Sequence, residues 1–301
     1  MRAFRYGTGL QTLGVLGGGA SAESYAYGIN TAGWVVGWSA TGKNSPGPAH
    51  AFRHNGVSMT DLGVIKKGGF SAAYDINDQN RVVGETSVTG ATHAFKYDTQ
   101  LRDLGTLPGY LDSRGYGVNA SGKIVGRAYG GTVVRAFLHD GTTMRDLGTL
   151  GGIYAEAYDI NDTDVVVGYS SNGVATHAFR YQGTTMTDIA PTVAYAVAYA
   201  VNNAGDIVGP PSTSPRGNLG RAFLYRDGQL VDLNTLIPTG SGWILTDAAD
   251  INDQGQITGI GTHNGERRTY RLDLTNNGLL ERCAPELRYH QFETYRADSV
   301  A

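Results

Sequence analysis

The sequence predicts an all-β protein with the fold of a six-bladed β-propeller, in which each blade is a four-stranded antiparallel sheet. Three observations predict it. A strand–turn–strand motif occurs six times in the 301 residues, aromatic positions recur every 42 to 47 residues, and the composition combines 44 glycines with only 17% charged residues. A repeat of about 40 to 45 residues with four strands is typical of a propeller blade, and many glycines supply its tight turns.

The strand–turn–strand motif is clearest at Asp159-Ile160-Asn161-Asp162. Apolar residues precede and follow this polar turn, as expected of a β-hairpin. Its six copies begin at Tyr27, Tyr74, Tyr116, Tyr158, Tyr199 and Asp250, and each ends in an asparagine. One hairpin recurs along the whole chain, so the chain is predicted to be a repeat protein.

Each repeat is expected to contain four strands, named A to D in chain order. In the fourth repeat they are expected at residues 157–161, 165–170, 177–181 and 186–189. Asn, Asp or Gly stands in the A–B and C–D turns, where hairpins need unusual backbone angles. Strand C carries the aromatic residue that fixes the period: Phe52, Phe95, Phe137, Phe179, Phe223 and Tyr270.

The N-terminal residues are expected to close the ring. The sixth repeat supplies strands A, B and C from residues 247–273 but no strand D, whereas residues 10–14 resemble a strand D without a preceding A and B. Closure of this kind removes open sheet edges. Both residues 3–6 and residues 269–272 resemble strand C, so a five-stranded last blade or a truncated seventh blade remain alternatives.

The propeller is expected to span residues 1–273 as one domain. Residues 274–301 leave the repeat pattern and form a C-terminal extension. A short helix is expected there from Ala284-Pro285-Glu286, because proline is tolerated in the first turn of a helix.

The repeats resemble the HAF-repeat family, named after a His-Ala-Phe strand. The matching segments are His93-Ala94-Phe95, His177-Ala178-Phe179, residues 146–152 (Asp-Leu-Gly-Thr-Leu-Gly-Gly) and the Asp-Ile-Asn hairpins, within residues 1 to 273. The resemblance implies a propeller-like repeat fold and export from a bacterial cell, since such repeats are mostly described as extracellular bacterial proteins of unassigned role. It implies no catalytic residues.

Charge and hydropathy narrow the classes of partner. The formal net charge is −3 and the isoelectric point is near 6.1, so we expect no nucleic-acid partner. No apolar run approaches the roughly 20 residues of a membrane span. No signal peptide is visible after Met1, so we expect an extracellular or periplasmic protein if an export signal has been removed, and otherwise a cytoplasmic one.

The hairpin turns resemble calcium loops in composition. Asp75, Asn77 and Asp78 offer the oxygen ligands that calcium prefers. In the other three repeats, however, the first carboxylate is replaced by Gly28, Gly117 and Ala200. Turn formation therefore explains the motif better. We expect no cofactor and no metal site, with calcium at these turns as the alternative.

The residue at the start of strand C alternates between two types of hydrogen-bond donor. It is histidine or arginine, at His50, His93, Arg135, His177, Arg221 and Arg268. Arginine does not replace histidine as a metal ligand, so these residues are expected to share one structural role as donors.

The candidate site lies where the repeats differ. Five residues before the recurring asparagine stand Tyr25, Ala72, Arg114, Glu156, Val197 and Asp247. After the recurring glycine of strand B stand Trp38, Glu85, Arg127, Tyr169, Pro210 and Ile260. Strands A and B run antiparallel, so both sets, here called the mouth positions, are expected at one end of a central channel.

The mouth positions suggest three chemical roles. Arg114 and Arg127 are candidates to clamp an acidic ligand. Glu156, Asp247 and Glu85 are candidate acids or bases, and the aromatic residues Tyr25, Trp38 and Tyr169 are candidates to stack on a sugar or an aromatic ligand. The alternative is a solvated rim with internal salt bridges.

Three functions follow from these roles. The first is one asymmetric site for a small molecule or glycan fragment, with or without acid/base chemistry of the lyase, hydrolase or cyclase type. The second is a multivalent lectin-like binder with equivalent sites between blades. The third is a scaffold that binds a protein partner without catalysis. The loops between strands B and C differ strongly in length, which disfavours equivalent lectin sites.

Overall fold

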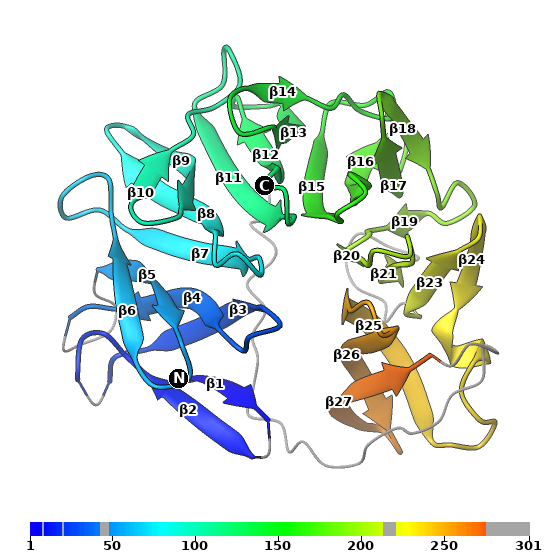
Figure 1. The fold of residues 1–301 in the computed structure, drawn as a ribbon. Coiled ribbons are helices and arrows are strands. Elements are labelled where there is room, and N and C mark those ends of the chain that lie inside the picture. The colour runs from blue at the N-terminus through cyan, green and yellow to red at the C-terminus, as the bar shows by residue number, and fades with distance from the viewer. Residues whose placement is uncertain (8, 20, 43–47, 213–220, 275–301) are drawn as a thin grey trace.

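The computed structural model describes residues 1–7, 9–19, 21–42, 48–212 and 221–274. Within these ranges the chain is all-β, apart from a short 3₁₀ helix at Leu233–Thr235. The strands form seven mostly antiparallel sheets that are arranged around a common centre (Figure 1). The predicted C-terminal helix falls outside the described residues.

Three consecutive repeats each form a four-stranded antiparallel sheet in the order A–B–C–D. The first repeat holds β3 (Ser24–Ile29), β4 (Val35–Ala40), β5 (Ala49–His54) and β6 (Met59–Gly63). The second holds β7 (Ser71–Ile76), β8 (Val82–Val88), β9 (Ala91–Tyr97) and β10 (Leu101–Asp103). The third holds β11 (Asp112–Val118), β12 (Ile124–Tyr129), β13 (Val134–His139) and β14 (Met144–Asp146).

The fourth and fifth repeats each form a sheet, and two short strands of the fifth repeat join the sheet of the fourth. The fourth holds β15 (Ala155–Ile160), β16 (Val166–Ser171), β17 (Thr176–Gln182) and β18 (Thr185–Asp188). Two short strands, β19 (Tyr195–Ala196) and β22 (Pro211–Ser212), extend its sheet through β17. The fifth repeat holds β20 (Ala200–Val201), β21 (Ile207–Gly209), β23 (Phe223–Arg226) and β24 (Gln229–Asp232).

The two ends of the described chain form smaller sheets. The sixth repeat has three strands, β25 (Trp243–Ile251), β26 (Gln256–His263) and β27 (Glu266–Asp273). The N-terminal strands β1 (Ala3–Tyr6) and β2 (Leu10–Gly14) pair with each other in a separate two-stranded sheet. The repeated four-stranded sheets are therefore confirmed. The described N-terminal strands do not pair with the last sheet, and their separate sheet corresponds to the alternative of a truncated seventh unit.

The N-terminal pairing has a simple physical reason. Only three residues separate β1 from β2, whereas pairing β2 with β27 joins segments more than 250 residues apart. Closing the short loop loses less conformational entropy. The predicted strand C of the N-terminus thus takes its own strand D as partner, and β27 keeps a free edge within the described residues.

A bulge in strand A explains the recurring glycine of strand B. In the fourth repeat the pairing skips from Ala157 to Asp159, so Tyr158 is an extra residue. The bulge brings the Glu156 carbonyl toward Gly168, where an added Cβ would lie 1.9 Å from that oxygen. Only glycine fits such a close approach.

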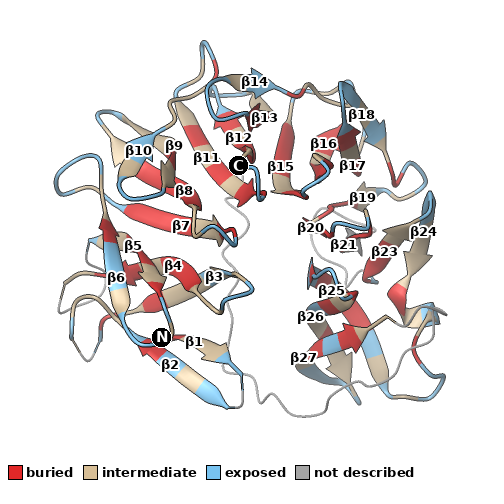
Figure 2. Ribbon diagram, in the orientation of Figure 1, coloured by how far each residue is buried: buried red, intermediate tan, exposed pale blue. Residues whose placement is uncertain are grey.

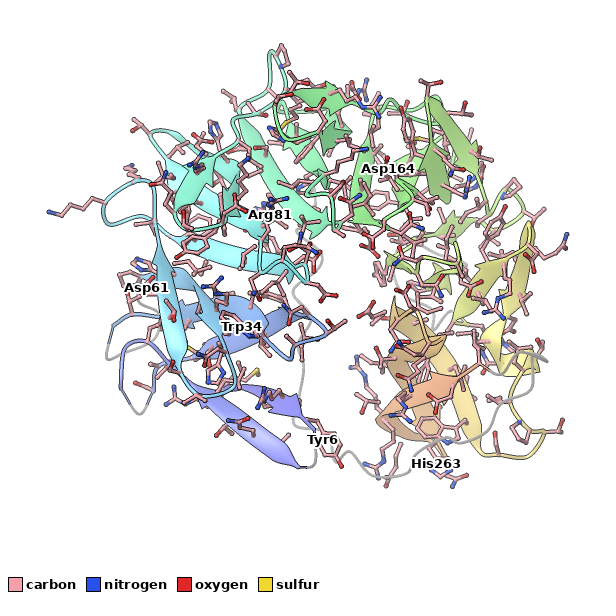
Figure 3. The ribbon with its side chains drawn as sticks, viewed as in Figure 1. Tyr6, Trp34, Asp61, Arg81, Asp164 and His263 are labelled. Carbon is pink, nitrogen blue, oxygen red and sulfur yellow. The ribbon has the colours of Figure 1, made fainter. Side chains whose placement is uncertain are left out.

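The apolar cores lie between neighbouring sheets. The Phe side chain of strand C is fully buried in every repeat that has one, and it packs with apolar residues of strand A in its own repeat and with apolar residues of the preceding repeat. One core joins Val125 and Leu138 of the third repeat to Ala157 and Ile160 of the fourth. Figure 2 shows this burial in the middle of the strands, and side chains fill the spaces between sheets (Figure 3).

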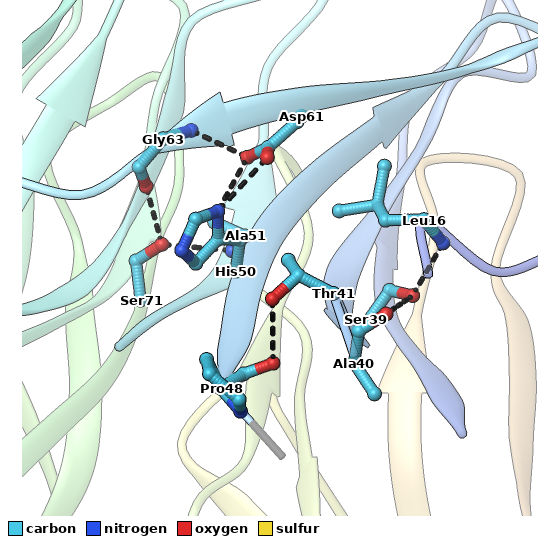
Figure 4. A network of polar contacts seen from close by, with 10 residues as sticks. All are labelled: Leu16, Ser39, Ala40, Thr41, Pro48, His50, Ala51, Asp61, Gly63 and Ser71. Carbon is cyan, nitrogen blue, oxygen red and sulfur yellow. Dashed lines mark hydrogen bonds and ion pairs between the residues drawn. The ribbon is translucent and has the colours of Figure 1, made fainter. Parts of the chain in front are cut away.

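Hydrogen bonds and an ion pair connect strands C and D to each other and to the first strand of the next sheet (Figure 4). His50 Nδ1 lies 2.8 Å from Asp61 Oδ2 on the neighbouring strand D, and Asp61 also accepts from the Gly63 N–H. Ser71, which begins the next repeat, donates to the Gly63 carbonyl and accepts from the Ala51 N–H.

The predicted donor role at the start of strand C is confirmed. Equivalent pairs form at His93–Asp103, Arg135–Asp146, His177–Asp188 and Arg221–Asp232. Arg268 contacts Glu266 instead, because β27 has no strand D beside it within the described residues.

Candidate functional site

The asparagines that end strand A form a belt from repeat to repeat. The Asn77 side chain donates to the Asn119 carbonyl at 2.9 Å, and Asn119 and Asn161 donate in the same way to Asn161 and Asn202. Each amide oxygen also accepts N–H groups of its own turn, as Asn161 does from Thr163 and Val165. Each asparagine of this belt therefore stabilises its own turn through the amide oxygen and joins it to the turn of the next repeat through the amide nitrogen.

The aspartates of the same hairpins join the repeats in alternation. Asp75 accepts the Val118 N–H at 2.9 Å, and Asp159 accepts the Val201 N–H at 2.8 Å, so the second and fourth repeats are tied to the next odd one. The neighbouring odd repeat has glycine here, and a Cβ on Gly117 would lie 3.0 Å from the Asp159 Cα.

At the remaining junctions, the hydrogen bond is accepted by the aspartate that directly follows the recurring asparagine. Asp78, Asp162 and Asp253 accept the backbone N–H groups of Thr31, Ala120 and Asn203. These bonds run from odd to even repeats, opposite in sense to those of Asp75 and Asp159. The hairpins consequently fall into two alternating types, which we call odd and even.

The aspartates within strand A make the stability of the fold depend on pH. Burial raises the pKa of Asp159 to about 7, and Asp75 and Asp250 add to the rise. Desolvation by the surrounding protein atoms also raises the pKa of Asp250 to about 6. Asp250 is exposed to solvent, however, and this exposure reduces the rise. Asp159 is therefore the better probe.

We expect Asp159→Asn to gain stability relative to the unsubstituted protein between pH 5 and pH 8. A carboxyl with a raised folded-state pKa favours folding while protonated, so its contribution is complete below about pH 4 and is lost as the pH rises through 7. Urea midpoints of both proteins at several pH values measure the difference.

Asp140→Asn is the control for this titration. Hydrogen bonds from Thr143 and Thr142 lower the pKa of Asp140, so its stability term is lost only under acid conditions and does not change between pH 5 and pH 8. A constant difference for Asp159→Asn across that range means that Asp159 stays ionised throughout.

The two mouth positions of a repeat lie directly opposite each other across strands A and B. The register pairs Tyr25 with Trp38, Ala72 with Glu85, Arg114 with Arg127, Glu156 with Tyr169 and Asp247 with Ile260. The two sets thus lie opposite each other, as expected of antiparallel strands A and B, and their place at the mouth of a channel stays a prediction.

The second and third repeats meet at a buried ion pair. Arg114 Nε lies 2.8 Å from Glu85 Oε2, and the Glu85 side chain is only 6% exposed. Tyr74 donates its hydroxyl to the other Glu85 oxygen. Burial lowers the pKa of Arg114, but Glu85 and Tyr116 outweigh that effect and raise it, so the guanidinium stays charged.

The third and fourth repeats meet at a second ion pair, in which the arginine again comes from the third repeat and the carboxylate comes from the fourth. Arg127 Nη1 donates to Glu156 Oε1 at 2.6 Å, and the Glu156 side chain is 7% exposed. Tyr169 forms a hydrogen bond with the same carboxylate, and burial followed by Glu156 raises its pKa, so the hydroxyl stays protonated. The row Glu85–Arg114–Arg127–Glu156 thus runs unbroken over three sheets.

A ladder of tyrosines accompanies this row. The rings of Tyr27, Tyr74, Tyr116, Tyr158 and Tyr199, one from each of five repeats, follow each other at centroid distances of 5.4 to 5.7 Å. Burial and the nearby Glu156 raise the pKa of Tyr116 to about 12. The sequence displayed this recurring tyrosine, but only as part of the hairpin motif.

The other mouth positions are mostly apolar. Tyr25 and Trp38 stack at 4.6 Å, and the Trp38 indole N–H donates to the Tyr27 hydroxyl at 3.2 Å. Val197 and Pro210 occupy the fifth repeat and Ile260 the sixth. Asp247 lies two sheets beyond Glu156, with Tyr270 donating to its backbone carbonyl, so it is not brought beside the two glutamates.

The described residues give no grouping for a metal ion. Among them, no three His, Cys, Asp or Glu side chains come together as a metal site would require. The Asp75 oxygens instead accept the N–H groups of Ile76 and Val118. Over the same residues, no helix is long and apolar enough to cross a membrane.

Comparison with known families gives one match. A family model described as a protein of unknown function (DUF3466) matches residues 149–280, which covers the fourth to the sixth repeats. No curated protein matches the chain.

Proposed function

We propose that the chain is a six-bladed β-propeller with a single binding site at the mouth positions, which takes a small anionic ligand such as an organic carboxylate or an acidic glycan fragment. The observation that carries the proposal is the Arg114–Arg127 pair. These two guanidiniums lie opposite each other on one sheet, and their carboxylate partners come from the two neighbouring sheets.

The alternating hairpins support six blades. Even repeats offer a carboxylate to the next odd repeat, so a ring in which every junction is satisfied needs an even number of repeats. The chain has six hairpins, three of each type. A seventh blade would place two hairpins of the same type side by side.

The arginines have donors to spare. A guanidinium has five N–H groups, and each ion pair with Glu85 or Glu156 uses one nitrogen. The side chains of Arg114 and Arg127 are 31% and 23% exposed, whereas both glutamates are almost fully buried. The accessible groups at this place are donors, and a carboxylate ligand suits two neighbouring guanidiniums.

The opposite part of the ring suits an uncharged ligand face. Tyr25 and Trp38 present an aromatic surface on the first repeat, and the half-buried Pro210 and Ile260 present apolar ones on the fifth and sixth. A uronic acid combines a carboxylate with a flat C–H face, which matches both halves of the mouth. Export of the protein, implied by the HAF-repeat resemblance, is consistent with such a ligand.

Binding fits the geometry better than catalysis. Glu85 forms an ion pair with Arg114 and accepts from Tyr74. Glu156 accepts from Arg127 and forms a hydrogen bond with Tyr169, so both carboxylates serve to hold the arginines. A multivalent lectin would need equivalent mouth residues in each repeat, and these differ in all six. If no ligand binds in the test below, the result favours a scaffold without a ligand site.

We expect Arg114→Lys to weaken binding of the anionic ligand at least tenfold. Lysine keeps a positive charge for Glu85 but loses the planar set of donors, so a bidentate contact is lost while the ion pair remains. Glucuronate, galacturonate, their oligomers and citrate are first screened by thermal shift, and the best ligand is titrated calorimetrically.

Arg102→Lys is the matched control, because Arg102 is exposed on the outer strand β10. Neutral glucose and galactose control for the carboxylate. Binding that is equal for neutral and acidic sugars, or unchanged in Arg114→Lys, contradicts an anion site at the arginine pair.

A further inference from the structure

The junction between the sixth and the first repeat is open in this structure. Ile29 is 56% exposed and Tyr27 is 51% exposed. The residues at the place of Ile29 in the other repeats are at most 6% exposed, namely Ile76, Val118, Ile160, Val201 and Ile251. Figure 1 shows β1 and β27 on the two sides of this opening, and Figure 3 places Tyr6 and His263 there.

At the closed junctions a carboxylate of one repeat accepts an N–H group of a neighbouring repeat. One side of the opening carries such a carboxylate, and the other carries the matching N–H group. Asp250 is an even-type aspartate, and the N–H that would match its carboxylate, by analogy with Val118 and Val201, is that of Ile29. The Asn252 side chain donates to Gln256 of its own turn, whereas the other belt asparagines donate to the next repeat.

We infer that the sixth and first repeats join directly and close the ring, with Asp250 accepting the Ile29 N–H and Asn252 donating to the Asn30 carbonyl. The hairpin types argue against a partner inserted between them. One additional hairpin would have to be odd toward the sixth repeat and even toward the first, which requires at one position both an aspartate and a small residue without a carboxylate, as at Gly117 and Ala200.

The N-terminal strand β1 occupies the place that closure needs. The Ala3 N–H donates to Ser24 Oγ at 2.9 Å, and Ser24 donates to the Gly14 carbonyl. Ala51 and Gly63 contact Ser71 in the same way, so β1 and β2 fill the positions of strands C and D before the first repeat. In the sixth repeat the residue equivalent to Ala3 is Thr269, on β27.

Closure therefore proceeds by strand exchange. β27 replaces β1 beside Ser24, and β2 stays in place and becomes the fourth strand of the last sheet. This inference rests on the proposed six-bladed propeller and regulates its site, because only closure makes Asp247 and Ile260 the neighbours of Tyr25 and Trp38. While β1 is bound, the mouth is incomplete.

A cysteine pair across the opening tests the inference. Ile29→Cys and Asp250→Cys are combined with Cys283→Ser, which removes the chain's own thiol. Asp75→Cys with Val118→Cys, in the same background, is the reference at a junction that the structure shows closed. A short thiol crosslinker is expected to give an intramolecular product in both proteins, with a yield across the opening at least twofold below that of the reference, because β1 competes with β27 there.

Ala3→Pro tests the strand exchange separately. Proline removes the N–H that binds Ser24 and weakens β1, so the yield across the opening is expected to rise at least twofold. An unchanged yield overturns the exchange. A crosslinked dimer, or no product while the reference pair reacts, overturns closure itself.

Ligand titration separates this inference from the proposed function. If the ring crosslinks but no acidic ligand binds before or after crosslinking, closure stands and the anion site fails. If the ligand binds equally well to the protein with and without the crosslink, the regulatory role of closure is overturned while the anion site stands.

Discussion

Asn161→Ala is expected to lower the free energy of unfolding by about 3 kcal/mol, since each buried polar group left without a partner costs about 1 to 3 kcal/mol. Asn161 is 5% exposed. Its amide donates to the Asn202 carbonyl at 2.8 Å and accepts from the Thr163 and Val165 N–H groups. Alanine removes all three bonds and a link between two sheets at once.

The matched control is Asn55→Ala. Asn55 also accepts two backbone N–H groups of its own turn, from Val57 and Ser58, but the site is exposed and water can replace the lost bonds. Urea unfolding of both variants measures the difference. Equal losses for the two variants would mean that the belt contributes only turn formation and no coupling between sheets.

Arg127→Ala is expected to destabilise the fold by about 3 kcal/mol, because removing one partner of a buried ion pair leaves an uncompensated charge. Glu156 is almost fully buried, and Arg127 is the cation that lies 2.6 Å from it. The Tyr169 hydroxyl remains beside the carboxylate but supplies no charge. Thermal and urea unfolding measure the loss.

Two further variants separate charge from packing. Arg127→Met combined with Glu156→Leu removes both charges and is expected to recover most of the lost stability, as replacement of a buried pair by apolar residues often does. Arg102→Ala, at an exposed site on β10, is expected to be nearly neutral. A melting temperature unchanged by Arg127→Ala would favour the solvated rim that the sequence offered as its alternative.

The strands and the pairing of the mouth positions were predictable from the sequence, because they follow from local patterns repeated six times. Each copy tests the alignment of the others, so the recurring asparagine and glycine locate Glu156 opposite Tyr169 without any structure. The donor role of His50 was predictable for the same reason, since Arg135 fills the equivalent place.

The contacts between repeats were not predictable in the same way. Whether Arg114 meets Glu85 or another carboxylate depends on how two sheets pack, which no single repeat encodes. The bulge at Tyr158 was missed because an extra residue within an apolar–polar pattern still resembles strand alternation. The alternation of Asp75 with Gly117 was visible, but its meaning required the Val118 N–H as the partner.

The sequence prediction joined the N-terminal strands to the last sheet and kept a truncated seventh blade as an alternative. The separate two-stranded sheet corresponds to that alternative, because two segments compete for one place. β1 and β27 both carry the strand C pattern, and pattern alone does not rank a short local loop against a contact between the chain ends. The described structure shows the local solution, and the exposed Ile29 shows what that solution leaves uncovered.

The tyrosine ladder also gives the molecule an optical reporter of its own. Phenol rings spaced 5.4 to 5.7 Å apart are close enough to pass excitation energy from one to the next, and the ladder starts at Tyr27, whose hydroxyl accepts from the Trp38 indole. Light absorbed by the tyrosines of five repeats can thereby reach the Trp38 indole. In a protein whose other two tryptophans, Trp34 and Trp243, are replaced, we expect the emission of Trp38 to report on the opening without any attached dye.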